Sequence, residues 1–398
     1  MVTAEAVHTL VGELVAVDSV NPALVPGGAG EGAISVLVAD RMREAGLEVE
    51  ILDADGRPSV VGIARGRGGG RSLMLCGHLD TVGVAGMADP FVPALRDGRL
   101  HGRGAYDMKA GVVAAMLAAA EAAGAGLAGD VIVAAVADEE HASVGVQAVL
   151  ERVRADACVV TEPTGLDVVV AHKGFAWWEI EASGRAAHGS RPDLGVDAIA
   201  ALGPVLVALA ELEVELAGRP HPRLGPGSVH AALIEGGVEL STYPDRCVLG
   251  IERRTLPGET SAQLEAELAA LVAAGERVER RPVAGSAWGA AEAAATPGVG
   301  AAAWAARTLL ERPPFEVADD APIVTAVRAA AAARLGREPR LRGHSAWMDA
   351  AFTSAAGIPT VVFGPDGAGA HEVEEWVELD SVRACAEVLA DVASAFCA

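Results

Sequence analysis

The chain has 398 residues, enough for two or three domains at about 150 residues each, and 51% of them are hydrophobic, enough to fill sizeable cores. A formal net charge of −23 argues against nucleic acid and anionic membranes as partners. The first residues, MVTAEAVHTL, lack the basic segment and apolar core of a secretion signal, and no apolar run approaches the length of a membrane span. We therefore expect a cytoplasmic protein.

Helices alternate with apolar strands up to about residue 174. The predicted helices are 3–17, 31–45, 110–123 and 143–153, and the predicted strands are near 47–53, 59–65, 72–77, 131–137 and 157–160. This alternation is typical of an α/β domain with a mostly parallel sheet covered by helices on both faces.

The pattern changes character after residue 174. The next elements follow a β-α-β-β-α order: strand 175–183, helix 195–212, strands near 228–236 and 245–254, and helix 260–274. Residues 276–306 are rich in Ala and Gly without a clear period, and a last strand is predicted near Arg307 to Glu311. The chain then passes Pro313-Pro314 and returns to an α/β pattern with helix 321–335, strands 340–343 and 360–363, and helix 380–396.

The segment LMLCGHLDTVG contains the first candidate metal ligand. His78 and Asp80 lie two residues apart at the end of an apolar strand, so their side chains point to the same face. A metal-binding histidine usually donates its second ring N–H to a carboxylate, which fixes the tautomer. The alternative is a pair that only caps a turn.

Further acidic and imidazole side chains follow other predicted strands or lie in loops. These candidates are Asp107, Glu139, Glu140, Glu162 and His371. In an open α/β sheet, ligands bind outside the carboxyl ends of the strands, so these side chains can converge on one crevice. Carboxylates and imidazoles suit zinc, cobalt or manganese, and two ions roughly 3.5–4 Å apart need a bridging carboxylate.

These segments resemble the metallopeptidase superfamily of acetylornithine deacetylase, succinyl-diaminopimelate desuccinylase and aminoacylase, over nearly the whole chain. The resemblance implies a catalytic domain of metallo-exopeptidase type at 1–174 and 313–398. It also implies an inserted α+β lid and dimerisation domain at 175–312, a small four-stranded sheet with two helices.

The same resemblance assigns roles to the candidate ligands. It implies that His78, Asp107 and Glu162 hold one metal ion, and that Asp107, Glu140 and His371 hold the other, with Asp107 bridging. It further implies that Asp80 orients His78 and that Glu139 acts as general base. The alternatives are a pseudoenzyme and an acidic crevice without ions.

Three residues of the predicted lid are candidates for substrate contact. His188, in GRAAHGSRP, matches the imidazole that in the family reaches over the partner subunit's active site and supports the oxyanion; the alternative is a surface-turn histidine. Arg254, in ERRTLPGET, matches the arginine that binds a substrate carboxylate, and pairing with Glu252 is the alternative. Ser241, in GGVELSTYP, stands where relatives commonly have an asparagine, so either the contact is rearranged or Thr242 and Tyr243 contribute.

Trp347, in GHSAWMDAA, forms either an aromatic wall for an acyl group or part of the core. The five scattered cysteines form no C-x-x-C pair, so buried thiols are expected rather than disulfides.

The sequence thus predicts a hydrolase with two divalent metal ions, zinc before cobalt or manganese, that cleaves the amide bond of N-acyl amino acids as a homodimer paired through the lid. The alternatives are an exopeptidase or dipeptidase with the same machinery and an N-carbamoyl amino acid hydrolase. From a different class, the alternative is a non-catalytic binding protein on the same fold, against which the complete ligand set and Glu139 speak.

Overall fold

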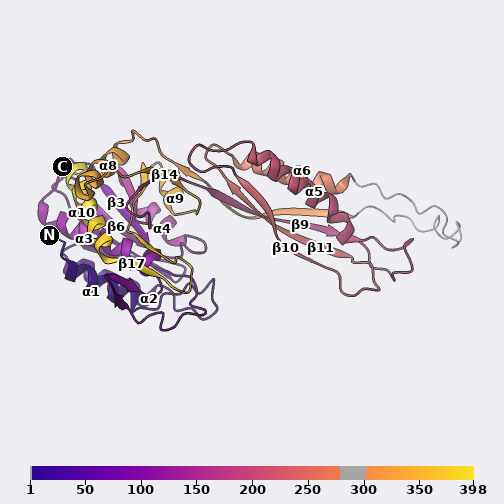
Figure 1. Cartoon of the computed structure of the whole chain (residues 1–398), viewed down its shortest axis with the longest axis horizontal. Helices are drawn as coiled ribbons and strands as arrows, with labels where there is room; N and C mark the ends of the chain where they lie inside the picture. The colour runs from indigo at the N-terminus through magenta and orange to yellow at the C-terminus, as the bar shows by residue number, and fades with distance from the viewer. Residues whose placement is uncertain (1, 278–301) are drawn as a thin grey trace. The chain divides into compact units, whose positions relative to one another are not determined.

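The computed structural model describes residues 2–277 and 302–398, and the chain divides into two compact units (Figure 1). Unit 1 consists of Met1–Ala171, Phe315–Gly343 and Met348–Ala398, and unit 2 of His172–Pro314 and His344–Trp347. The predicted insertion 175–312 falls within unit 2, which also includes the loop that carries Trp347. Most of the unassigned stretch 276–306 lies outside the described residues.

The described part of unit 1 is built on a nine-stranded sheet in the order β1-β2-β6-β3-β7-β15-β8-β13, with β14 paired to β8. The strands are β1 (Glu48–Ala54), β2 (Arg57–Ala64), β3 (Leu73–His78), β6 (Val131–Val136), β7 (Ala157–Val160), β8 (Val168–His172), β13 (Phe315–Glu316), β14 (Leu341–His344) and β15 (Thr360–Val362). The central pairs β6–β3, β3–β7 and β7–β15 are parallel, and β1–β2, β2–β6 and β15–β8 are antiparallel. The predicted α/β fold with a parallel centre is confirmed.

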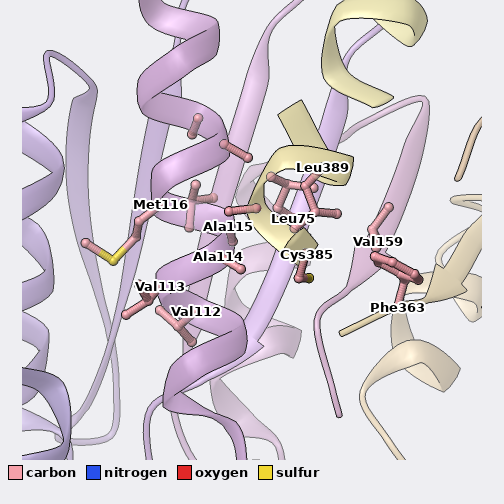
Figure 2. Close-up of a cluster of buried hydrophobic side chains, with 14 of the residues drawn as sticks. Leu75, Val112, Val113, Ala114, Ala115, Met116, Val159, Phe363, Cys385 and Leu389 are labelled. Atoms are coloured by element: carbon pink, nitrogen blue, oxygen red, sulfur yellow. The ribbon is translucent and has the colours of Figure 1, made fainter. Parts of the chain in front are cut away.

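Helices pack on this sheet and on one another. They are α1 (Ala4–Val15), α2 (Gly32–Glu44), α3 (Ala110–Ala125), α4 (Val144–Arg152), α8 (Pro322–Leu335), α9 (Ala350–Ala355) and α10 (Leu379–Phe396). Strand β3 is buried along its whole length, and α3 packs against both β3 and α10. Figure 2 shows their side chains in one core, with Leu75 beside Ala115, Cys385 and Leu389. The prediction that no apolar run approaches the length of a membrane span is wrong for one segment. Ala105–Ala125 is long and apolar enough to cross a membrane, but it is mostly buried inside unit 1, as a core helix would be.

A second, small sheet in unit 1 joins two loops that are distant in sequence. It has the order β16-β17-β5-β4, with β4 (Ala94–Arg96), β5 (Arg99–His101), β16 (Gly367–Ala368) and β17 (Trp376–Glu378). The pairing of β17 with β5 brings the loop after β5, which runs into the helical turn η1 (Ala105–Lys109), beside the loop between β16 and β17. These short strands were not predicted from the sequence.

Unit 2 is an antiparallel sheet packed against two helices. Its strands follow the order β10-β11-β9-β12, with β9 (Gly174–Ser183), β10 (Ser228–Gly236), β11 (Arg246–Thr255) and β12 (Ala303–Arg312). Helices α5 (Ala198–Ala217) and α6 (Ser261–Glu276) cover the face on which alternate residues of β9 and β11 are buried. Strand β10 is an edge strand and is exposed over most of its length.

Candidate metal centre

The candidate ligands come from three neighbouring strands and two loops of unit 1. His78 is the last residue of β3, while Glu139 and Glu140 follow β6 and Glu162 follows β7. Because β6, β3 and β7 are adjacent and parallel, their carboxyl ends meet at one edge of the sheet. Asp107 in η1 and His371 in the loop between β16 and β17 complete the group.

The carboxylate of Asp107 lies between two imidazoles. Its Oδ1 is 3.2 Å from His78 Nε2, and its Oδ2 is 3.2 Å from His371 Nε2. Glu162 Oε1 lies 3.6 Å from His78 Nε2, and Glu140 Oε2 lies 3.1 Å from His371 Nε2. These distances are compatible with two three-residue ligand sets that share Asp107.

Glu139 also lies close to the first set, with its Oε2 4.0 Å from His78 Nε2. One ligand atom each from His78, Glu139 and Glu162 lie within 4.8 Å of one another, as do those from His78, Asp107 and Glu140. Distance alone therefore does not separate Glu139 from the ligands, and its role as base remains a prediction.

The crowded, buried carboxylates of this cluster favour the binding of cations. Burial raises the pKa of Glu139 well above its usual range and that of Glu162 to about 8. Hydrogen bonds with Asp107 and Glu140 raise the pKa of His371 to about 10. Glu140 Oε1 is buried and has no hydrogen-bond partner within residues 2–277 and 302–398. Divalent cations would satisfy that oxygen and neutralise the carboxylates, so the residues present fit a metal centre.

Asp80 is completely buried, and its backbone carbonyl, rather than its carboxylate, is hydrogen-bonded to His78. His78 Nδ1 is hydrogen-bonded to the backbone carbonyl of Asp80 at 2.9 Å, while the nearest carboxylate oxygen is 3.6 Å away. The carboxylate instead accepts the backbone N–H groups of Glu139 (3.1 Å) and Glu140 (3.2 Å). Asp80 thus holds His78 through its backbone and the two glutamates through its side chain.

Behind Asp80 lies a buried polar network that the sequence analysis missed. Asn21 Nδ2 donates to Asp80 Oδ2 at 2.8 Å and to Asp138 Oδ1 at 3.0 Å. Arg57 binds Asp138 at 2.7 Å and Glu31 at 2.5 Å. No local sequence pattern marks these residues, because their contacts join segments far apart in the chain.

The comparisons with known proteins identify the family. The model of peptidase family M20/M25/M40 matches residues 74–395. The chain belongs to this family. It is therefore a hydrolase of a metal-dependent peptidase and deacylase family that acts on small substrates.

This M20 family protein is similar to three known proteins at low sequence identity. The acetylornithine deacetylase of Photorhabdus laumondii subsp. laumondii is 26% identical over 387 residues, covering 91% of this chain and 89% of the relative. The aminopeptidase PepT of Bacillus cereus has a TM-score of 0.75 at 22% identity, covering 98% of each chain. The YXEP protein of Bacillus subtilis, reported as a dinuclear metal binding peptidase, has a TM-score of 0.71 at 16% identity, covering 99% of this chain and 98% of its own.

The substrate-contact candidates of this M20 family protein all lie in unit 2. His188 is exposed, and its Nδ1 accepts the backbone N–H of Ser190 (3.2 Å) and pairs with the Ser190 hydroxyl (2.8 Å). In the neutral ring, the proton is then on Nε2, which makes His188 a hydrogen-bond donor at its outer nitrogen. The Ser241 hydroxyl donates to Glu239 at 3.2 Å, as does that of Thr242 at 2.6 Å.

Arg254 is paired with Glu252, which was the alternative to its predicted role in substrate binding. Its Nη2 lies 3.0 Å from Glu252 Oε1, and its guanidinium lies over the Phe175 ring at 5.3 Å. Trp347 packs edge-on against His172 and Phe175, and its indole N–H donates to the Pro313 carbonyl at 3.1 Å. Trp347 is only partly buried, so it retains some exposed aromatic surface.

Proposed function

We propose that this M20 family protein is a di-metal amidohydrolase that releases the amino acid from N-acyl amino acids. The observation that carries the proposal is the Asp107 carboxylate, held 3.2 Å from both His78 and His371 as a bridging ligand would be. The acetylornithine deacetylase at 26% identity supports a deacylase as the first candidate.

The centre would be held by two overlapping sets of residues. His78, Asp107 and Glu162 would bind one cation, and Asp107, Glu140 and His371 the other, with zinc as the first choice and cobalt or manganese as alternatives. When bound, the two cations lower the pKa of a water molecule and polarise the scissile carbonyl.

Glu139 would move the proton. As a carboxylate, Glu139 would take a proton from water and return it to the leaving amine, and the burial that raises its pKa makes that carboxylate a stronger base. Asp80 fixes the backbone of Glu139, so the carboxylate starts from a defined position.

The residues of unit 2 would bind the rest of the substrate. His188 Nε2–H would donate to the carbonyl oxygen as negative charge develops there. Arg254 would bind the α-carboxylate in competition with Glu252, its present ion-pair partner. Ser241 would contribute only if its hydroxyl leaves Glu239.

We also propose a cytoplasmic homodimer that pairs through unit 2. Among the described residues, β10 is an edge strand that pairs with β11 on one side, and it carries Leu233 (76% exposed) and Ile234 (56% exposed). Val238 and Leu240 follow it and are also exposed. A long apolar edge of this kind is normally covered in a stable protein, and two-fold pairing of identical edges is the simplest cover.

A substrate panel tests the activity. Metal-free protein reloaded with zinc or cobalt is assayed for amine release from N-acetyl, N-succinyl and N-carbamoyl amino acids and from dipeptides, with the chelated protein as control. The proposal expects metal-dependent release that is fastest with an N-acyl amino acid. Faster cleavage of dipeptides would make the protein an exopeptidase, the second candidate that the family description favours. No metal-dependent release from any substrate would leave the non-catalytic alternative.

A further inference from the structure

One buried carboxylate in unit 1 has no role in the chemistry proposed above. Glu375 is 1% exposed and lies in the loop between His371 and β17. Its Oε1 accepts the backbone N–H groups of Tyr106 and Asp107, both at 2.9 Å. Its Oε2 accepts the N–H of Gly104 at 2.9 Å and Arg103 Nη1 at 2.7 Å. One side chain thus holds the backbone at two positions of the η1 turn and at the residue just before it.

This turn needs an external support. Asp107 has φ −112° and ψ 96°, which are not helical, so the regular helical hydrogen bonds of α3 cannot fix it. The Glu375 carboxylate, which accepts a hydrogen bond from the Asp107 N–H, therefore fixes the backbone position from which the Asp107 side chain extends. Charged acceptors of backbone N–H groups form hydrogen bonds roughly twice as strong as neutral ones.

Arg103 connects the same turn to the loop of His371. It is 3% exposed, and its Nη2 donates to the Glu372 carbonyl at 3.0 Å while its Nη1 binds Glu375. The Arg103–Glu375 pair thus joins the backbone next to Asp107 with the backbone next to His371. The Arg103–Glu375 pair therefore links the two loops that carry Asp107 and His371, whose Oδ2 and Nε2 atoms are 3.2 Å apart.

We propose that Glu375 is a positioning residue that places the bridging Asp107 and sets the affinity of the centre for its cations. This inference rests on the proposed di-metal function. Glu375 acts through the backbone of Asp107 and is not one of the proposed ligands.

The test is a titration of cobalt(II) into metal-free protein, followed by calorimetry and by the visible absorption of the bound ion. Glu375→Gln keeps the size of the side chain but replaces one acceptor oxygen with an NH₂ donor that faces other donors. Cobalt affinity should fall roughly 10–100-fold and the absorption bands should change, as when outer residues of metal sites are replaced. Glu374→Gln, at the exposed neighbouring position, is the matched control and should behave as wild type.

A folded Glu375→Gln protein with wild-type affinity and spectrum would overturn the inference. If that variant does not fold, Glu375→Asp decides, because it keeps the charge and withdraws the carboxylate by one methylene. A weakened cobalt affinity in Glu375→Asp supports the positioning role, and an unchanged one refutes it. Absence of cobalt binding by the wild type would instead refute the metal centre itself, which separates the two failures.

Discussion

Glu139 and Glu140 are adjacent in sequence but have different surroundings. Glu140 Oε2 lies 3.1 Å from His371 Nε2, and its other oxygen is buried without a hydrogen-bond partner in the described part of the chain, whereas Glu139 Oε2 lies 4.0 Å from His78 Nε2. We expect Glu139→Gln to keep its metal content and to lose at least about 100-fold in kcat, because it removes proton transfer and no ligand. Glu140→Gln should lower metal occupancy, measured by elemental analysis. The opposite pattern would mean that the two roles are exchanged.

Asp167 gives a pH-dependent contribution to stability. It is 1% exposed and accepts hydrogen bonds from Arg340 Nε at 2.8 Å, Arg340 N–H at 3.1 Å and Arg337 Nη1 at 3.2 Å. Burial acts to raise its pKa, but the arginine hydrogen bonds outweigh it and the pKa lies below the usual value. A carboxyl of this kind adds stability above its unfolded pKa of about 3.9, and that stability is lost as the pH falls through the lower folded pKa.

Asp167→Asn should therefore reduce the free energy of unfolding at pH 7 by about 1–3 kcal/mol, since it weakens hydrogen bonds to charged groups. The difference from wild type should shrink below about pH 4, where the wild-type carboxyl also becomes protonated. Urea unfolding of the metal-free proteins at both pH values measures it. Glu338→Gln, whose side chain is 75% exposed, serves as control and should change little at either pH. A pH-independent loss would show that Asp167 contributes by packing rather than by charge.

At the scale of elements, helix α3 is set against the end of β7 by a glycine. A Cβ added at Gly111 would overlap the backbone carbonyl oxygen of Thr161, the residue before Glu162. Gly111→Ala should push the start of α3 away from the end of β7 and lower the free energy of unfolding by about 1–3 kcal/mol. It should also weaken metal binding, because Glu162 directly follows the displaced residue. Gly124→Ala in the same helix has open space and should be stabilising by roughly 0.5–1 kcal/mol. Denaturant unfolding and metal titration of both variants check this, and equal behaviour would refute the close-approach argument.

The sequence predicted the long elements and some short ones, such as β7 and β15, but missed the shortest strands. Helices such as α10 and strands such as β3 have apolar patterns long enough to be recognised, and their boundaries differ from the prediction by one or two residues. Strands β13, β16 and β17 have only two or three residues, too few for any period to appear. They exist because neighbouring strands pair with them, which no local pattern records.

The candidate site also contains residues that could be predicted from the sequence and residues that could not. The ligand types and their places after strands were visible in the sequence, and the structure brings His78, Asp107, Glu140, Glu162 and His371 together. Glu375 was not visible, because its partners at Gly104, Tyr106 and Asp107 are backbone groups more than 260 positions away in the chain. Asp80 shows the remaining limit: the spacing placed it beside His78, but only the structure showed that the backbone makes the contact.

At the scale of the whole molecule, the proposed dimer predicts that each active site takes residues from two chains. Every candidate ligand lies in unit 1 and His188 lies in unit 2. Glu139→Ala and His188→Ala proteins should each be nearly inactive, but mixed refolding should form heterodimers with one site that has both groups. Random pairing would restore roughly a quarter of wild-type sites. Heterodimers that form without any recovery of activity would place His188 in its own chain's site or outside the reaction.

The order of strands in unit 1 also affects how the chain folds during its synthesis. Strand β15 (Thr360–Val362) lies between β7 (Ala157–Val160) and β8 (Val168–His172), so the sheet cannot close until the ribosome has translated nearly the whole message. Until then, the apolar edges of β7 and β8 stay unpaired in the nascent chain. Unit 2, apart from His344–Trp347, is one continuous stretch and can fold while translation proceeds. We expect newly made chains to carry a folded unit 2 while unit 1 stays open until β15 has left the exit tunnel.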